Sequence, residues 1–173
     1  MGSIIRKKRD NIDISTFWNA IGHRPSGITL VTANGENGSA GFLALSTAHV
    51  TATPPTMLVS IEKKTSALKA ILESNHFAIN ILPLGTEELV NSFAGKGDLK
   101  GAERFDPKLW TIMSSGAPIY NSAVMAMDCM VEEVIERKSV SIVIGQVIDL
   151  LINQDQSAII YYKGNYRSLP EKN

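Results

Sequence analysis

The sequence has 173 residues, of which 44% are hydrophobic and 20% are charged, and its formal net charge at pH 7 is zero. A chain of this length can bury one core and is too short for two ordinary domains, so we expect a single domain over residues 13–173. The charged residues before it predict a flexible basic arm over residues 1–12. The balanced charge excludes a bulk attraction to nucleic acid or to an acidic membrane, and a small molecule is the expected partner.

Cysteine usage and hydropathy give expectations about compartment and chemistry. Cys129 is the single cysteine, which excludes an intramolecular disulfide and a CxxC site and fits a cytoplasmic location. Its apolar neighbours predict a packed thiol rather than a reactive one. The apolar runs are shorter than the roughly 18 residues of a membrane span, and the three histidines are too scattered in sequence to predict a metal site.

The first predicted element is a short amphipathic helix that begins after Asp13 or Ser15 and ends near Gly22. Its apolar residues recur at helical spacing: Ile14, Phe17, Trp18 and Ile21. This spacing places them on one face, and we expect that face to pack against the rest of the protein.

The following segments predict a β-hairpin. Residues 28–33 are rich in β-forming side chains, and residues 34–39 read NGENGS, which contains Asn-Gly and Gly-Ser turn signals. Residues 40–48 then form the expected second strand. Because this second strand is made of small and hydroxylated residues, it is also the expected wall of a ligand site.

The middle of the chain mixes strands and helices. We expect a strand over residues 56–62, a helix over 67–73, a strand over 76–82 and a second short helix over 87–94. Residues 95–116 contain glycine, proline and charges with little periodicity, which predicts a long loop. A loop of this length in a compact domain usually serves a site or stays disordered.

The C-terminal part predicts β-structure throughout. Residues 123–136, 140–152 and 158–169 read as three long antiparallel strands separated by short polar breaks. Together with the earlier strands they are enough to close an antiparallel barrel. The expected fold class is mainly β with short helices.

The segment from Gly41 to Ser66 carries the clearest signs of a ligand site. Its small residues allow the backbone to approach a ligand closely, and its hydroxyl groups offer hydrogen bonds. Residues 63–66, KKTS, lie where an apolar strand meets a helix, and there free backbone N–H groups and the helix dipole favour a phosphate. Thr65 or Ser66 is the expected N-cap of that helix.

Several motifs occur in a characteristic order: RPSGITLVTA (24–33), GFLALSTAHVTATPP (41–55), SIEKKTS (60–66), HFAINIL (76–82), SFAG (92–95), ERF (103–105), IGQV (144–147) and YYKGNYRSL (161–169). By their order and spacing, the chain resembles the flavin reductase-like family of FMN-binding split barrels. Within that family it is similar to the reductase components of 4-hydroxyphenylacetate 3-monooxygenases and to corrin reductases, which reduce cob(II)yrinic acid a,c-diamide in cobalamin biosynthesis.

The resemblance implies a flavin site built from three groups of residues. The ring and ribityl chain would lie near Pro25, Ser26, Leu45, Ser46, Thr47, Ala48 and His49. The phosphate would lie near Lys63, Lys64, Thr65 and Ser66, and a neighbouring subunit would often supply Phe93, Lys100, Arg104 and Phe105. From the residues alone, His49 fits solvent as well as a flavin contact, and residues 100–105 equally fit a solvated charged loop.

The resemblance also implies the chemistry. It predicts FMN, with FAD as an alternative, and a hydride transferred from NADH or NADPH to flavin N5, with the chemistry carried by the cofactor. It further predicts a homodimer that passes electrons to free flavin, a monooxygenase partner or a corrinoid. The absence of a GxGxxG fingerprint in the sequence agrees with a nicotinamide that stacks transiently on the flavin.

One departure from the family pattern affects the expected nicotinamide site. Many members carry a Gly-Asp-His element before the strand that here reads VSIVIGQV, and the aligned residues are Lys138, Ser139 and Val140. The missing histidine leaves flavin binding untouched and opens the question of how NADH docks. It also keeps open an alternative of another class, a flavin-binding module without turnover.

Overall fold

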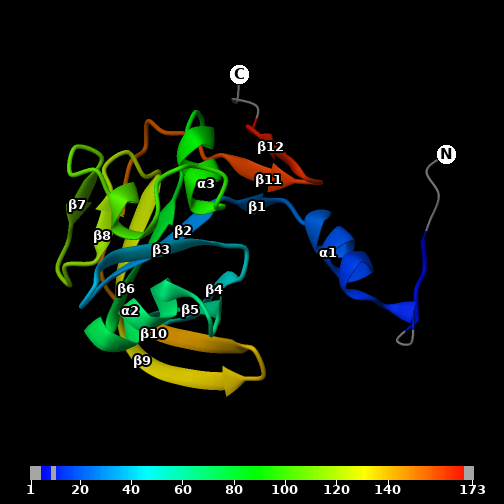
Figure 1. Ribbon diagram of the computed structural model, residues 1–173, viewed down its shortest axis with the longest axis horizontal. Helices are drawn as coiled ribbons and strands as arrows, with labels where there is room; N and C mark the ends of the chain where they lie inside the picture. The colour runs from blue at the N-terminus through cyan, green and yellow to red at the C-terminus, as the bar shows by residue number, and fades with distance from the viewer. Residues whose placement is uncertain (1–4, 9–10, 170–173) are drawn as a thin grey trace.

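A computed structural model describes residues 5–8 and 11–169, and a curved antiparallel sheet forms its body (Figure 1). The expected arm over residues 1–12 lies partly outside these ranges. Seven strands make up the sheet, in the spatial order β3 (Gly38–Ala44), β2 (Thr29–Gly35), β6 (His76–Ile81), β9 (Met125–Arg137), β10 (Val140–Ile152), β5 (Pro55–Glu62) and β4 (Thr47–Ala52).

The two edge strands of this sheet, β3 and β4, are neighbours in the sequence. Leu45 and Ser46 alone separate them, so the sheet has to curl until its two edges meet. The Ser60 N–H donates to the Ser46 carbonyl oxygen at 3.3 Å, which extends the pairing of β4 with β5 into the junction. The curled, antiparallel sheet confirms the predicted barrel architecture.

The predicted single strand over residues 40–48 is therefore wrong. The structure ends β3 at Ala44 and starts β4 at Thr47, and β4 pairs with β5 rather than with β2. Small residues continue through the junction without a turn signal, so the sequence pattern hides the point at which the chain changes its strand partner.

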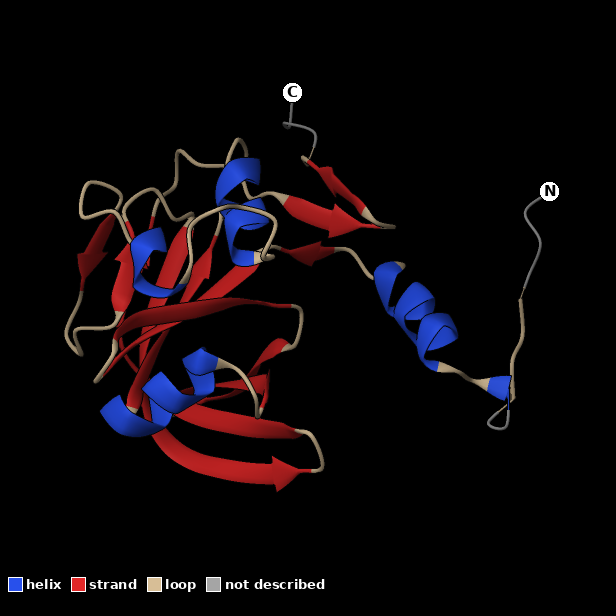
Figure 2. Cartoon of the chain, viewed as in Figure 1, coloured by secondary structure: helices blue, strands red, loops and turns tan. Residues whose placement is uncertain are grey.

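Two helices complete the cores on either side of the sheet (Figure 2). Helix α2 (Ser66–Ser74) lies on β2 and β3 and buries Ala67, Leu68, Ala70 and Ile71, the spacing of one helix face. Thr65 caps it by accepting a hydrogen bond from the Leu68 N–H at 3.3 Å, which confirms the predicted cap. Helix α3 (Glu87–Phe93) contributes Val90 and Phe93 to the second core.

The predicted long loop over residues 95–116 contains regular structure. A 3₁₀ helix, η2 (Gly101–Arg104), precedes β7 (Trp110–Ile112), which pairs with β8 (Pro118–Tyr120). These elements are too short to show periodicity in the sequence. Tertiary contacts hold them instead: Trp110 is 8% exposed in an aromatic cluster, and the Ser115 N–H donates at 2.7 Å to the buried carboxylate of Asp128.

The predicted C-terminal strand over residues 158–169 is also divided. The chain turns at Lys163 and Gly164, which both have positive φ angles, so that β11 (Ile160–Tyr162) pairs with β12 (Asn165–Arg167). The same β11 pairs with β1 (Ser26–Gly27) on its other side. This small sheet connects the main body to the N-terminal segment.

Helix α1 (Ile14–Gly22) forms where the sequence predicts it, and Asp13 caps it by accepting from the Thr16 N–H at 2.7 Å. The expected packing is wrong. Ile14, Phe17 and Trp18 are 79%, 50% and 57% exposed, and α1 projects away from the sheet (Figure 1). Helical periodicity identifies an apolar face, but it does not show whether the same chain covers it.

Cys129 is fully buried on β9, which confirms the predicted packed thiol. Burial, and then the nearby Asp128 carboxylate, raise the pKa of this thiol to about 12. Within the described part of the chain, each helix is too short or too polar to cross a membrane.

Candidate functional site

The junction between β3 and β4 forms one wall of a cavity of about 310 Å³, which we call the corner cavity. Ala44, Leu45 and Thr47 line it from the junction, and Pro25 and Ser26 line it from the start of β1. The structure thus brings together four of the residues expected near a flavin ring, from two segments that are about 20 positions apart in the sequence. The lining mixes small and polar residues with Leu45 and Ile81, which suits the edge of a flat ring that carries hydrogen-bonding atoms.

Arg24 also lines the corner cavity, and it was missing from the predicted site. One terminal nitrogen of its guanidinium donates to the Leu45 carbonyl oxygen at 2.6 Å. A charged hydrogen bond of this kind fixes the backbone at the point where β3 becomes β4. The arginine opens the motif RPSG, but the motif gives no sign that it reaches the strand junction.

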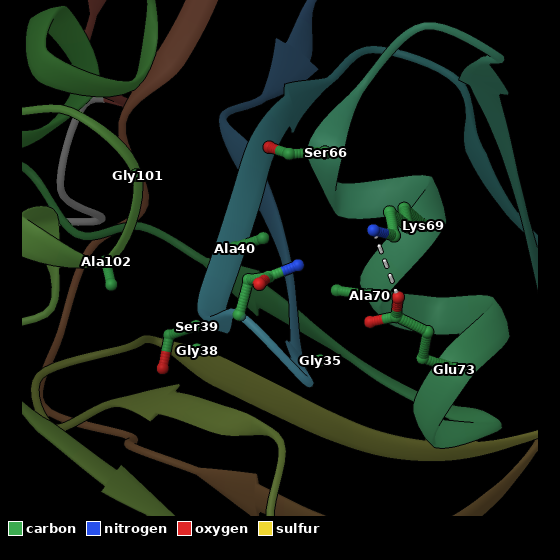
Figure 3. A pocket seen from close by; sticks show the side chains of 11 residues that line it. Gly35, Gly38, Ser39, Ala40, Ser66, Lys69, Ala70, Glu73, Gly101 and Ala102 are labelled. Carbon is green, nitrogen blue, oxygen red and sulfur yellow. Dashed lines mark ion pairs between the residues drawn. The ribbon is translucent and has the colours of Figure 1, made fainter.

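A second cavity, of about 200 Å³, lies between α2, the β2–β3 hairpin and η2, and we call it the helix cavity (Figure 3). Lys69 and Glu73 form its charged side, and their side chains pair at 3.5 Å. Facing them lie the polar and small residues of the hairpin. The lining consists of Gly35, Asn37, Gly38, Ser39, Ala40, Ser66, Lys69, Ala70, Glu73, Gly101 and Ala102.

Strand β3 connects the two cavities. Its first residues, Gly38 to Ala40, line the helix cavity, and its last residue, Ala44, lines the corner cavity. Because β3 is an edge strand of the described sheet, one side of its backbone lacks a strand partner there. The arrangement fits an elongated molecule with a flat ring at one end and an anionic group at the other.

The structure separates the residues predicted to hold a phosphate. Ser66 lines the helix cavity. Lys63, in contrast, forms an ion pair with Glu136, and Lys64 pairs with Glu62 at 3.0 Å. The hydrogen bonds from Lys63 and from the Ser141 hydroxyl lower the pKa of Glu136, so its carboxylate stays charged beside Lys63.

Thr65 is occupied by the helix start. Its hydroxyl donates to the Glu62 carbonyl oxygen at 2.9 Å while accepting from Leu68. Of the predicted group over residues 63–66, Ser66 is therefore the member that faces a cavity.

The residues predicted to reach the flavin from the loop pack mainly against one another. Phe93 is 8% exposed and packs edge-on against Phe105, with ring centroids 5.4 Å apart, while the Arg104 guanidinium lies 5.3 Å from the Phe93 ring centroid. The backbone N–H of Lys100 donates to the Glu103 carboxylate at 3.1 Å. The segment reaches the helix cavity instead through Gly101 and Ala102.

The remaining predicted ring residues lie on the outer side of the junction. Ser46 donates to the Ser60 carbonyl oxygen at 3.0 Å, which links the junction to β5. Ala48 and His49 are exposed on β4. Gly41 allows Phe93 to pack closely, since a Cβ atom there would lie 3.0 Å from the Phe93 ring.

The residues that replace the family histidine lie at the tip of the β9–β10 hairpin. Val140 pairs with Glu62, and the Lys63 N–H donates to the Ser139 carbonyl oxygen at 3.0 Å. The tip therefore adjoins the Lys63–Ser66 turn. Within a single chain it lies outside the corner cavity.

Lys69 is the main residue that sequence reasoning missed. It stands three positions after Ser66 on the same helix, and residues with this separation share a helix face. That spacing was the available signal, because it places Lys69 on the same side of α2 as Ser66, and both line the helix cavity. Asn37 and Ser39 carried less signal, since they looked like ordinary turn residues.

A family model described as flavin reductase like domain matches residues 21–170. The chain therefore belongs to this family, which confirms the predicted fold and makes the protein a flavin oxidoreductase rather than a binding module. It is 32% identical over 156 residues to an FMN reductase (NADH), RutF, of Pseudomonas syringae, covering 90% of this chain and 86% of that protein.

Solved structures agree with this assignment. The structure of the flavin reductase PheA2 in its native state is 26% identical to this chain and superposes on it with a TM-score of 0.82. The match covers 92% of this chain and 100% of the PheA2 chain. The homologue of nitrilotriacetate monooxygenase component B from Mycobacterium thermoresistibile is 25% identical with a TM-score of 0.80, covering 90% of this chain and 86% of that one.

Proposed function

We propose that this protein is an NADH-dependent FMN reductase that passes electrons to the oxygenase component of a two-component monooxygenase. The observation that carries the proposal is β3, an edge strand with the corner cavity at one end and the lysine-bearing helix cavity at the other. Family membership, a relative named FMN reductase (NADH) and a neighbour named as a monooxygenase component support it.

The residues around the two cavities fit FMN. The corner cavity offers Pro25, Leu45 and Thr47 to an isoalloxazine ring, and the helix cavity offers the Ser66 hydroxyl and the Lys69 ammonium to a phosphate. Bound there, the flavin supplies the acceptor for a hydride from the nicotinamide. Arg24 keeps the junction in place through its bond to the Leu45 carbonyl oxygen, so the ring meets a rigid wall.

We also propose a homodimer in which α1 packs on the partner subunit. Ile14, Phe17 and Trp18 form an apolar face that α1 holds away from the body of its own chain. Exposed aromatic side chains on a well-capped helix are typical of an interface, and a second copy is the partner that the family resemblance predicts.

The other acceptors and donors stay predictions. These are a corrinoid or free flavin as acceptor, NADPH as donor and FAD as cofactor, together with a cytoplasmic location. The resemblance to corrin reductases calls for a direct test, because a corrinoid is much larger than a nicotinamide and would need an open face on the ring.

Anaerobic stopped-flow spectroscopy tests the proposed function. The protein is mixed with NADH and FMN, and NADH oxidation and FMN bleaching are followed together. We expect both signals to change in step, and faster with NADH than with NADPH. A Co(II) corrinoid replaces FMN in a second arm. NADH oxidation that occurs with the corrinoid and not with FMN would replace the monooxygenase proposal, and an absence of NADH oxidation in both arms would refute a reductase.

A further inference from the structure

The helix cavity contains one cation and one anion from the same helix turn. Lys69 Nζ lies 3.5 Å from Glu73 Oε1, and the Lys69 side chain is 65% exposed. The second carboxylate oxygen of Glu73 accepts from the Glu36 N–H at 3.0 Å, which ties the end of α2 to the β2–β3 hairpin. Lys69 is thus free to turn toward a ligand, whereas Glu73 is fixed in place.

The β2–β3 hairpin meets helix α2 beside Glu73. A Cβ atom on Gly35 would lie 2.5 Å from Glu73 Oε2 and 2.8 Å from Ala70 Cα, so hairpin and helix touch at this point. Figure 3 shows Ser66, Lys69 and Glu73 following one another along α2, with Glu73 farthest from the helix start. A ligand that enters past Ser66 therefore meets the lysine first and the carboxylate last.

We propose that the Lys69–Glu73 pair selects FMN over FAD, with Lys69 binding the flavin phosphate and Glu73 disfavouring any extension beyond it. This inference rests on the proposed flavin site. One phosphate finds the Ser66 hydroxyl and a mobile ammonium group within the cavity. A second phosphate would meet the fixed negative charge of Glu73, and like charges at short range repel.

The proposal predicts opposite changes in flavin affinity for substitutions of the two residues. Lys69→Gln removes the cation and should weaken FMN binding about tenfold, because it deletes a charge-assisted hydrogen bond. Glu73→Gln removes the negative charge and keeps an acceptor for the Glu36 N–H. It should strengthen FAD binding more than FMN binding, so that the ratio of the two dissociation constants moves toward one.

The experiment measures dissociation constants of FMN, FAD and riboflavin by fluorescence titration, with thermal melting to establish that each variant is folded. Riboflavin has no phosphate and should respond to neither substitution. Lys64→Gln is the matched comparison, since Lys64 is another exposed lysine near the start of α2, paired with Glu62 outside the cavity. Inorganic phosphate should compete with FMN in the wild type and less so in Lys69→Gln.

We expect Lys69→Gln to weaken the binding of the phosphate-bearing FMN and to leave riboflavin binding unchanged. We expect Glu73→Gln to bring the dissociation constants of FAD and FMN closer together. The inference is overturned if Lys69→Gln weakens FMN and riboflavin binding equally, or if Glu73→Gln leaves the ratio of the FAD and FMN dissociation constants unchanged. It is also overturned if the wild type prefers FAD, or if Lys64→Gln weakens FMN binding and Lys69→Gln does not. Those outcomes leave the reductase intact. A wild type that binds none of the three flavins would instead overturn the proposed function itself.

Discussion

The exposed face of α1 gives a quantitative test of the proposed dimer. Phe17→Gln with Trp18→Gln removes the aromatic surface and keeps residues that favour a helix. The two side chains are 50% and 57% exposed, so each has about half of its surface left to bury on a partner. An aromatic side chain buries 150–250 Å², so about 100 Å² each, at about 25 cal/mol per Å², gives about 2.5 kcal/mol per residue.

Twofold symmetry doubles the effect. Two residues in each of two subunits amount to at most about 10 kcal/mol, and if half of this is realised, the dimer dissociation constant rises by about three to four orders of magnitude. Analytical ultracentrifugation over a concentration series measures this change. Far-UV circular dichroism tests whether α1 is retained in the variant.

A control separates the interface from a general loss of surface hydrophobicity. Leu109→Gln changes a residue that is 46% exposed and directly precedes β7, at the opposite end of the molecule from α1 in Figure 1. We expect it to leave the dimer unchanged. A wild type that is monomeric at micromolar concentration would refute the dimer, and a dimer that survives the double substitution would refute the role of α1.

Three further predictions concern single residues. Gly145→Ala should destabilise the fold by about 1–3 kcal/mol, because the new Cβ would lie 2.6 Å from Cε1 of the buried Phe77 ring; an unchanged melting temperature would contradict this contact. Cys129, with its pKa raised to about 12 by burial, should stay unreactive toward a disulfide reagent at neutral pH until denaturant is added; rapid labelling of the folded protein would show that the β9 core opens. The hydrogen bonds to Asp13, first of all from the Thr16 N–H, lower the pKa of this carboxyl below its ordinary 3.8. Its stabilisation of α1 is therefore fully present above the ordinary carboxyl pKa and is lost as the pH falls through the lowered value, so the Thr16 amide resonance should titrate there in the wild type and not in Asp13→Asn.

Much of the fold follows from local signals in the sequence. The helix over α2 is predicted by one apolar face and a threonine cap, and β9 and β10 are predicted by long runs of β-forming residues. Each of these signals acts between neighbours in the sequence, through hydrogen bonds and side-chain packing that the element makes with itself or along one face. The errors fall where an element depends on distant partners. The chain exchanges one strand partner for another at Leu45 and Ser46, and β7 is held by contacts to β8 and to an aromatic cluster.

The sequence by itself determined the family and the place of Ser66 at the start of α2. It also named Lys63 and Lys64 beside Ser66, because charge and spacing along the chain are all that a sequence displays. Only the tertiary structure decided that Lys63 and Lys64 pair with Glu136 and Glu62 away from the two cavities, while Lys69 pairs with Glu73 in the lining of the helix cavity. The physical reason is that an ammonium group goes to the carboxylate within its reach, and which carboxylate is within reach depends on how the β9–β10 hairpin and α2 pack around β5 and β3.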